Sequence, residues 1–253
     1  MIIDSDTHIS PVISDATIQV ESLLEQMEKS GVDRSLCWLQ PPYMRDIDES
    51  LRYVNDCVRK HPDKLLGFGW VDPHFGVEKG KATIKKCIEE YGFHGVKLNG
   101  AQNSFFIDDE AVSLPLVEEI AKTGKALAFH IGADEYDFTH PFRAAKIAKR
   151  YPELQIMLVH MGGASRPDLS GPCIEIAAEY PNLHLIGSCV GYTSIVRAIR
   201  VLGAERVSFG SDTPFSIMHA DVCAYEAFLA DFFTPKDRDL VMGENICRVL
   251  GIK

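Results

Sequence analysis

The chain has 253 residues, 46% hydrophobic and 25% charged, a composition typical of a globular protein that excludes collagen-like repeats, long disorder and a coiled coil. It carries 26 basic and 36 acidic residues, a formal net charge of −10, and such a surface repels the phosphates of nucleic acid and anionic membranes. No apolar run approaches the roughly 18 residues that a membrane-spanning helix needs. We therefore expect a small-molecule substrate, and neither a nucleic-acid nor a membrane partner.

The N-terminal segment and the cysteines indicate a reducing compartment. The first residues contain no basic segment followed by an apolar stretch, which predicts that there is no secretory signal peptide. The seven cysteines are scattered and form no Cys-x-x-Cys pair that would indicate a zinc or redox motif. This odd, dispersed set predicts reduced thiols and a cytoplasmic location.

Short apolar runs alternate with longer amphipathic segments along the whole chain. The runs predicted as strands cover residues 2–6, 34–39, 65–71, 95–99, 126–130, 156–160, 183–186 and 206–210. Helical periodicity between them is clearest over residues 18–30, 51–60, 80–91, 111–123 and 142–150. Pro and Gly mark the joints between a helix and the next strand.

This alternation predicts an α/β fold. Eight units of about 30 residues account for the whole length and favour a single (β/α)8 TIM barrel domain over residues 1–253. The alternative is an open doubly wound sheet, but its usual G-x-G-x-x-G sequence after the first strand is absent. Residues 235–253 are predicted to form two extra C-terminal helices that close the barrel.

Polar residues occur at or just past the C-terminal ends of the predicted strands, where a buried parallel strand should be apolar. Side chains alternate between the two faces of a strand, and this alternation places one set of polar side chains on the interior face of the barrel. The set consists of Asp4, Asp6, His8, Lys97, Asn99, His130, His160, Ser208 and Asp212. A single such histidine would usually be a hydrogen-bonded core residue, but imidazoles and carboxylates aimed at one point from several strands predict a metal site at the catalytic rim of the barrel.

The blocks that hold these residues resemble the amidohydrolase superfamily, in particular the amidohydrolase 2 branch with its aminocarboxymuconate semialdehyde and resorcylate-type decarboxylases. The matching blocks are IDSDTH at 3–8, GVKL at 95–98, AFHIG at 128–132, LVHMGG at 158–163, GSDTPF at 210–215 and GEN at 243–245. The resemblance implies that Asp6, His8 and His130 are metal ligands. It also implies that Asp212 is a ligand that accepts a proton from metal-bound water. His160 would be the acid or base beside that water, or a ligand of a second metal in binuclear relatives.

The chain departs from many relatives at the first strand, where Asp6 replaces the first histidine of a His-x-His pair. We expect one divalent metal ion, Zn or Mn. Two carboxylates and two imidazoles form a harder ligand set than one carboxylate and three imidazoles, and this favours Mn. Asp4 is expected to be a structural group that bonds the backbone or a histidine. Lys97 has two candidate roles, a structural or substrate-anion contact, or a carboxylated lysine that bridges two metals as in binuclear relatives.

Three functions are compatible with such a site. The first expectation is a hydrolase that attacks a small amide, ester or lactone with metal-activated water, with Asp212 and His160 as the catalytic groups. The alternatives are a nonoxidative decarboxylase of a small aromatic or muconate-type carboxylate, and a metal-binding barrel without catalysis. Arg166 and Lys97, with Arg143 as a further candidate, are expected to bind a substrate anion. The resemblance also implies pairing of two barrels through flank helices, a homodimer.

Overall fold

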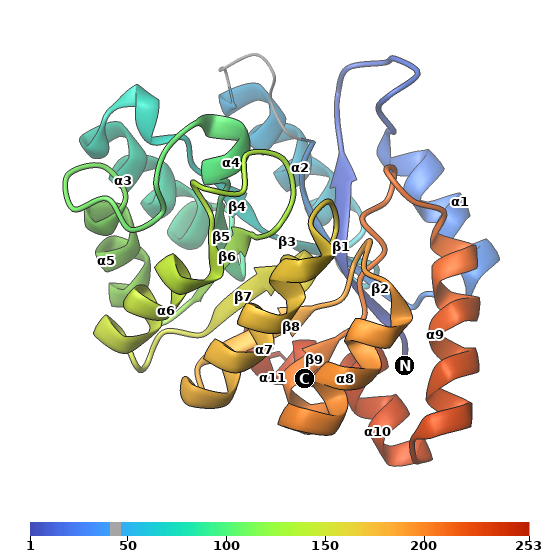
Figure 1. Cartoon of the computed structure of the whole chain (residues 1–253). Coiled ribbons are helices and arrows are strands. Elements are labelled where there is room, and N and C mark those ends of the chain that lie inside the picture. Colours follow the sequence, from blue (N-terminus) through green and yellow to red (C-terminus); the bar gives the residue numbers. More distant parts are fainter. Residues whose placement is uncertain (41–46, 253) are drawn as a thin grey trace.

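The apolar runs form parallel strands whose spatial order follows the chain (Figure 1). The computed structural model describes residues 1–40 and 47–252. The strands are β1 (Ile3–Ile9), β2 (Arg34–Leu39), β3 (Leu65–Gly67), β4 (Gly69–Trp70), β5 (Gly95–Leu98), β6 (Ala126–His130), β7 (Ile156–Val159), β8 (Leu183–Ile186) and β9 (Val207–Ser208). The short β3 and β4 are two parts of the strand predicted over 65–71, joined to β2 through Phe68, whose N–H donates to Cys37 O at 3.0 Å.

Hydrogen bonds between the first and last strand regions close the sheet into a barrel. Ser5 N donates to Phe209 O at 3.1 Å, and His8 N donates to Thr213 O at 2.8 Å. In the other direction Asp212 N donates to Asp6 O at 2.8 Å. The predicted barrel is confirmed and the open sheet is excluded, and this closure sets residues about 200 positions apart side by side.

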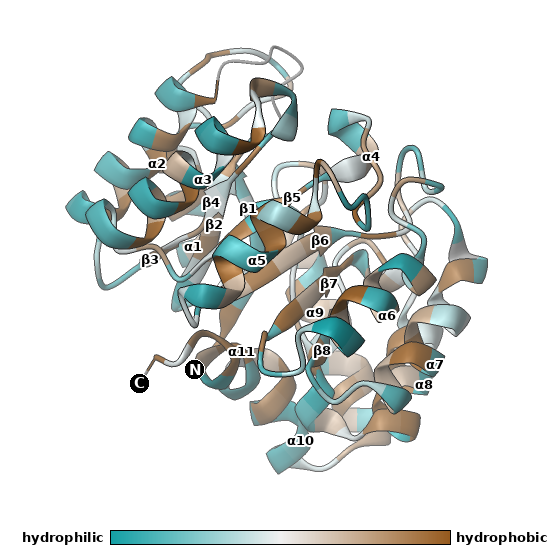
Figure 2. Ribbon diagram, turned by 90° about the vertical axis from the view of Figure 1, so that its left-hand side faces the viewer, coloured by the Kyte–Doolittle hydropathy of each residue, from teal (hydrophilic) through white to brown (hydrophobic). Residues whose placement is uncertain are grey.

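Helices surround the strands (Figure 1). They are α1 (Val20–Ser30), α2 (Asp48–Lys60), α3 (Val77–Lys85), α4 (Gly100–Asn103), α5 (Leu114–Lys122), α6 (Pro141–Arg150), α7 (Ser170–Glu179), α8 (Tyr192–Leu202), α9 (Met218–Phe232), α10 (Pro235–Asp239) and α11 (Asn245–Leu250). Figure 2 shows hydrophilic and hydrophobic residues alternating along α2 and α6, as expected of helices that bury one side against a sheet. No helix in the described part of the chain has the length and apolar character needed to cross a membrane.

Local sequence explains where several helices begin and end. Helix α1 buries Leu23 and Met27 and stops at Gly31, which adopts a left-handed conformation with φ of 70° that favours glycine. Helix α6 begins at Pro141, whose missing N–H costs nothing at a first helical position, and the His140 side chain accepts a hydrogen bond from Phe142 N. The two helices predicted in the C-terminal tail are confirmed as α10 and α11, with a π-helical turn over Leu240–Glu244 between them.

Strand ends differ from the prediction where the backbone turns toward the barrel mouth. Strand β7 stops at Val159, because His160 has a φ of 67° that no strand accommodates. Strand β9 is only two residues long, and the chain after it pairs with β1 through the irregular bonds that close the barrel. The residues of these strand ends carry the polar side chains described next.

Candidate metal centre

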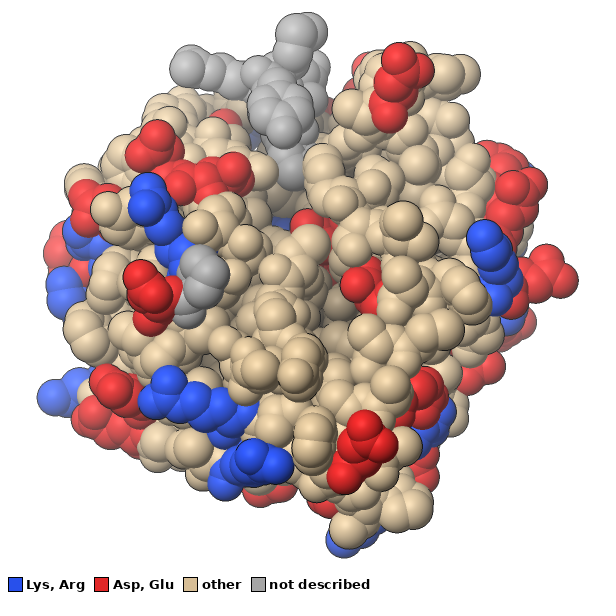
Figure 3. Space-filling view, turned by 45° about the vertical axis from the view of Figure 1, so that its right-hand side comes forward, with Lys and Arg blue, Asp and Glu red and all other residues tan. Residues whose placement is uncertain are grey.

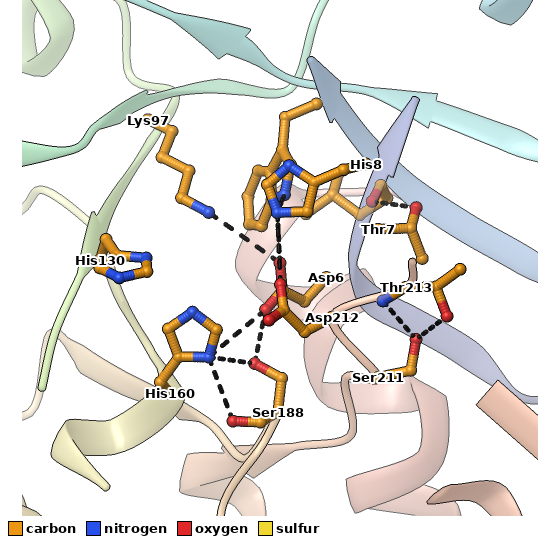
Figure 4. Close-up of polar contacts among 12 residues, drawn as sticks. Asp6, Thr7, His8, Lys97, His130, His160, Ser188, Ser211, Asp212 and Thr213 are labelled. Atoms are coloured by element: carbon orange, nitrogen blue, oxygen red, sulfur yellow. Dashed lines mark hydrogen bonds and ion pairs between the residues drawn. The ribbon is translucent and has the colours of Figure 1, made fainter. Parts of the chain in front are cut away.

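Side chains from four strand ends point toward one another at the mouth of the barrel (Figure 4). Asp6 and His8 lie on β1, and His130 ends β6. His160 directly follows β7, and Asp212 lies beyond β9 in the segment that pairs with β1. All five are buried, and the most exposed of them, Asp212, retains 9% of its accessible surface. The alternation of side chains along the predicted strands therefore placed all five residues at the correct end and on the correct face of the barrel.

The tautomer of His8 follows from its neighbours. Its Nδ1 lies 2.8 Å from the carbonyl oxygen of Leu39, which can only accept, so Nδ1 carries the hydrogen. Its Nε2 therefore presents a lone pair, which accepts a hydrogen bond from the Trp38 indole N–H at 3.1 Å. The same Nε2 lies 3.3 Å from Asp212 Oδ1 and 3.6 Å from Asp6 Oδ1.

Three acceptor atoms thus face one another in a buried space. Asp6 Oδ1 has no hydrogen-bond partner among the described residues, and the nearest cation is Lys97 Nζ at 4.0 Å. Burial and the adjacent charge of Asp6 raise the pKa of Asp212 to about 7. Burial and Lys97 lower the pKa of His8 to about 3, which keeps its imidazole neutral.

This arrangement fits a divalent cation. Asp6, His8 and Asp212 each offer a ligand atom, and these atoms lie within 4.8 Å of one another. Two buried carboxylates this close together are destabilising unless a cation or a proton neutralises their charge. Oxygen and nitrogen donors in this number suit Mn²⁺ or Zn²⁺.

His160 is oriented by Ser188. The Ser188 hydroxyl donates its single hydrogen to Asp6 Oδ2 at 2.5 Å, so the Nδ1 of His160 must be the donor in its contacts with Ser188 O at 3.1 Å and Ser188 Oγ at 3.0 Å. The Nε2 of His160 therefore carries a lone pair on the cavity side. Burial lowers the pKa of His160, and the neutral ring can accept a proton.

His130 lies beside this group but outside the set of three. Its ring meets that of His160 edge-on at 4.6 Å between centroids. Its Nε2 lies 3.4 Å from Asp134 Oδ2 without a hydrogen bond among the described residues. Burial lowers the pKa of His130 as well, so that its ring is also neutral.

Lys97 is completely enclosed behind the carboxylates. Its Nζ lies 3.9 Å from the centre of the Trp38 ring and 5.3 Å from that of Trp70, and it makes no hydrogen bond with a described residue. Burial lowers the pKa of Lys97, while the charges of Asp6 and Asp212 oppose this shift. The ammonium group is positioned to balance the charge of Asp6 and does not line the cavity in front of it.

The cavity at the barrel mouth has a volume of about 290 Å³. It is lined by His8, His130, His160, Cys189, Asp212 and Phe215, among others. No Lys or Arg side chain occurs in the described lining, and on the face in Figure 3 acidic and basic side chains are interspersed. Within the described lining, a bound metal ion is thus the candidate source of positive charge for a small anionic substrate.

Backbone strain is concentrated around this cavity. The non-glycine residues with positive φ that line it are Asp134 at 53°, His160 at 67°, Cys189 at 55° and Asp212 at 63°. A left-handed conformation costs an L-residue about 1–2 kcal/mol, and such residues gather at functional sites. The sequence contained no signal for this strain.

The predicted anion-binding arginines lie elsewhere. Arg166 is exposed, with its guanidinium 4.8 Å from the Tyr136 ring, and does not line the cavity. Arg143 is held by Asp108 at 2.7 Å. We therefore do not assign a substrate contact to either arginine, or to Lys97.

Three residues of the site carried no sequence signal or a weaker one. Asp4 is confirmed as a structural group, because its Oδ1 accepts hydrogen bonds from Asp6 N at 3.0 Å and Ser211 N at 2.9 Å. Ser188 and Cys189 were missed, since they follow β8, a strand without a polar interior residue at its predicted end. Only the folded chain shows that they contact Asp6 and Asp212.

Comparison with known proteins places these features in a family. A family model described as "Amidohydrolase" matches residues 45–252. Gamma-resorcylate decarboxylase from Polaromonas sp. strain JS666 is 25% identical over 256 residues, covering 77% of each chain. The same enzyme from Rhizobium sp. strain MTP-10005 is 24% identical, covering 79% of this chain and 78% of the relative.

Solved structures show the same fold. The 5-carboxyvanillate decarboxylase from Sphingomonas paucimobilis superposes with a TM-score of 0.78 at 19% identity, covering 100% of this chain and 99% of the other. Its counterpart from Novosphingobium aromaticivorans, complexed with manganese and 4-hydroxy-3-methoxy-5-nitrobenzoic acid, gives a TM-score of 0.79 at 17% identity, covering 100% and 96%.

Proposed function

The chain belongs to the amidohydrolase family, and we propose that it is a metal-dependent nonoxidative decarboxylase of a small hydroxylated aromatic carboxylate. The relatives with curated names are gamma-resorcylate decarboxylases, which favours the decarboxylase alternative over the hydrolase that we placed first. The observation that supports metal dependence is the buried group formed by Asp6, His8 and Asp212, in which His8 Nε2 lies 3.3 Å from Asp212 Oδ1 and 3.6 Å from Asp6 Oδ1 and all three ligand atoms lie within 4.8 Å of one another.

We propose Asp6, His8 and Asp212 as ligands of one divalent ion, and Mn²⁺ as the preferred metal because two of the three donors are carboxylates. His130 is kept as the fourth ligand that the family resemblance implies, since its Nε2 has no hydrogen bond among the described residues and its ring lines the same cavity. When bound, such an ion supplies positive charge for the substrate's carboxylate and for the negative charge that develops in the ring.

The protein groups divide the proton transfers between them. Asp212 is the acid that donates a proton to the ring carbon, and in the metal-free chain burial and the charge of Asp6 favour its protonated form. The bond from that carbon to the carboxylate breaks, CO2 leaves, and the proton takes its place. His160 presents its Nε2 lone pair to accept the hydrogen of a ring hydroxyl.

The size and lining of the cavity support a small substrate. Its volume of about 290 Å³ lies at the lower end of the range of ligand pockets, about 300–1,000 Å³. The aromatic ring of Phe215 lies 5.6 Å from that of His8 and forms one wall. A single-ring carboxylate fits this space better than an extended peptide or polymer would.

The experiment measures CO2 release by Mn²⁺-loaded protein from a panel of hydroxybenzoates, with amides, esters and lactones assayed in parallel. In D2O the product should carry one deuterium at the carbon that lost the carboxylate. His160→Gln is expected to lower kcat by about 10²–10⁴-fold, the contribution of a positioned acid or base. The control His219→Gln changes an exposed histidine on α9 and should have no effect. Hydrolysis of an ester, lactone or amide without CO2 release from any carboxylate would overturn the proposal in favour of a hydrolase.

A further inference from the structure

The carboxylate of Asp212 lies between two groups of potential metal ligands. Its Oδ1 faces His8 Nε2 at 3.3 Å, in the group already described. Its Oδ2 accepts a hydrogen bond from the thiol of Cys189, with Sγ at 3.4 Å. The two oxygens of one side chain are thus directed to different partners, as in a carboxylate that bridges two cations.

The second group combines Asp212 with Cys189 and His160. One ligand atom from each lies within 4.8 Å of the other two, so small side-chain movements suffice to enclose an ion. Cys189 follows β8 and is exposed at the cavity, whereas His160 is 2% exposed. All three have positive φ, and the three strand ends therefore share one backbone conformation.

Two imidazole nitrogens, one of them buried without a hydrogen bond among the described residues, point to a ligand in this space. Figure 4 shows the Nδ1 of His160 facing Ser188, to which it donates, so the Nε2 of this cavity-lining ring carries the lone pair. Next to it, His130 Nε2 makes no hydrogen bond with a described residue, and His130 is 7% exposed. Buried imidazole nitrogens usually have a partner, and an ion would supply one here.

We propose that His160, Cys189 and Asp212 form a second cation subsite, selective for a thiophilic divalent ion such as Zn²⁺. Thiolate and imidazole are softer donors than the carboxylate pair of the first group, and a sulfur, nitrogen and oxygen set with one open position is a common zinc environment. The two subsites differ in softness, so enzyme already loaded with Mn²⁺ at the first takes up Zn²⁺ at the second.

Occupancy of this subsite inhibits the enzyme. It takes the Nε2 of His160 and the Oδ2 of Asp212, which are the groups assigned above to the proton transfers. This consequence rests on the proposed function, whereas binding of the ion to the three side chains does not.

The test uses Co²⁺ as a spectroscopic substitute for Zn²⁺ on the metal-free protein. A Co²⁺–thiolate bond gives a charge-transfer band in the near ultraviolet, which oxygen and nitrogen ligands do not produce. We expect the wild type to bind two equivalents and to show the band, and Cys189→Ser to bind one equivalent and lack it. Asp6→Asn removes a ligand of the first group and should keep the band.

The matched control is Cys223→Ser. Cys223 is an exposed cysteine on α9 with its Sγ 3.9 Å from His219 Nε2, and it is the natural competitor for a thiophilic ion. The band should persist in this variant. A band that is absent in the wild type, that persists in Cys189→Ser or that disappears in Cys223→Ser would overturn the subsite.

A second measurement separates this proposal from the proposed function. Zn²⁺ added to the Mn²⁺-loaded enzyme should inhibit CO2 release, and Cys189→Ser should raise the Zn²⁺ concentration for half-inhibition at least about tenfold, the loss of affinity that even an outer-sphere change causes. If the wild type binds one equivalent of Co²⁺, shows no Co²⁺–thiolate band and still decarboxylates its substrate, only the second subsite is refuted. Binding of no divalent ion at all would refute the metal dependence of the proposed function as well.

Discussion

The raised pKa of Asp212 makes a quantitative prediction for Asp212→Asn in the metal-free protein. Asparagine has nearly the shape of a protonated aspartate, and its amide cannot ionise. Burial and the neighbouring Asp6 raise the pKa of Asp212 from 3.8 to about 7 in the folded chain. In the unfolded chain the carboxyl returns to its ordinary value.

The sign follows from proton binding. Between these two pKa values the folded state holds a proton that the unfolded state has lost, so the contribution of Asp212 to stability is fully present below about pH 4 and is lost as the pH rises through about 7. From about pH 5 to pH 7.5 the loss amounts to about 2 to 3 kcal/mol at 1.36 kcal/mol per pKa unit. Asp212→Asn lacks this loss. Its free energy of unfolding relative to the wild type should therefore rise by that amount as the pH is raised over this interval.

The assay is urea unfolding of chelator-treated wild type and variant at both pH values. His8 titrates in the opposite sense, because its pKa is lowered to about 3 in the folded chain, but burial and Lys97, the main causes of that shift, are the same in both proteins. The control Asp231→Asn changes an exposed carboxylate on α9. The quantity compared is the free energy of unfolding of Asp212→Asn minus that of the wild type. If it stays constant or falls between the two pH values, the raised pKa of Asp212 is refuted, and with it the acid role.

Two further predictions concern the scaffold that holds the site. Gly132 has a φ of 79°, and a Cβ there would lie 2.2 Å from the Gly162 carbonyl carbon, so Gly132→Ala should destabilise the protein by at least about 1–3 kcal/mol and lower Tm in a calorimetric scan. The Asn245 side chain donates to Ala204 O at 2.7 Å and Val207 O at 2.8 Å. Asn245→Ala should cost about 2–4 kcal/mol in urea unfolding, because both buried carbonyls lose a donor, and an unchanged midpoint would show that water replaces it.

Local patterns in the sequence were sufficient to predict the strands, most helices and which polar side chains face the interior of the barrel. Alternation with a period of two depends only on neighbouring residues, so Asp6 and His8 could be placed on one face, and His130 on the interior, without knowledge of the rest of the chain. The predicted strand over 34–39 agrees with β2, and that over 126–130 with β6. The rule that barrel strands end at one rim then predicted that the polar residues meet.

Which side chains contact one another at the mouth of the barrel depended on closure of the barrel. The Ser188 hydroxyl contacts Asp6 across 182 positions, and Cys189 reaches Asp212 from the neighbouring strand end. No local period relates such residues, because their distance depends on strand tilt, register and the left-handed turns that aim each side chain. The same applies to Lys97: its sequence position predicted an inward side chain, but only the packing of Trp38 and Trp70 around its Nζ decided that it faces the carboxylates and not the cavity.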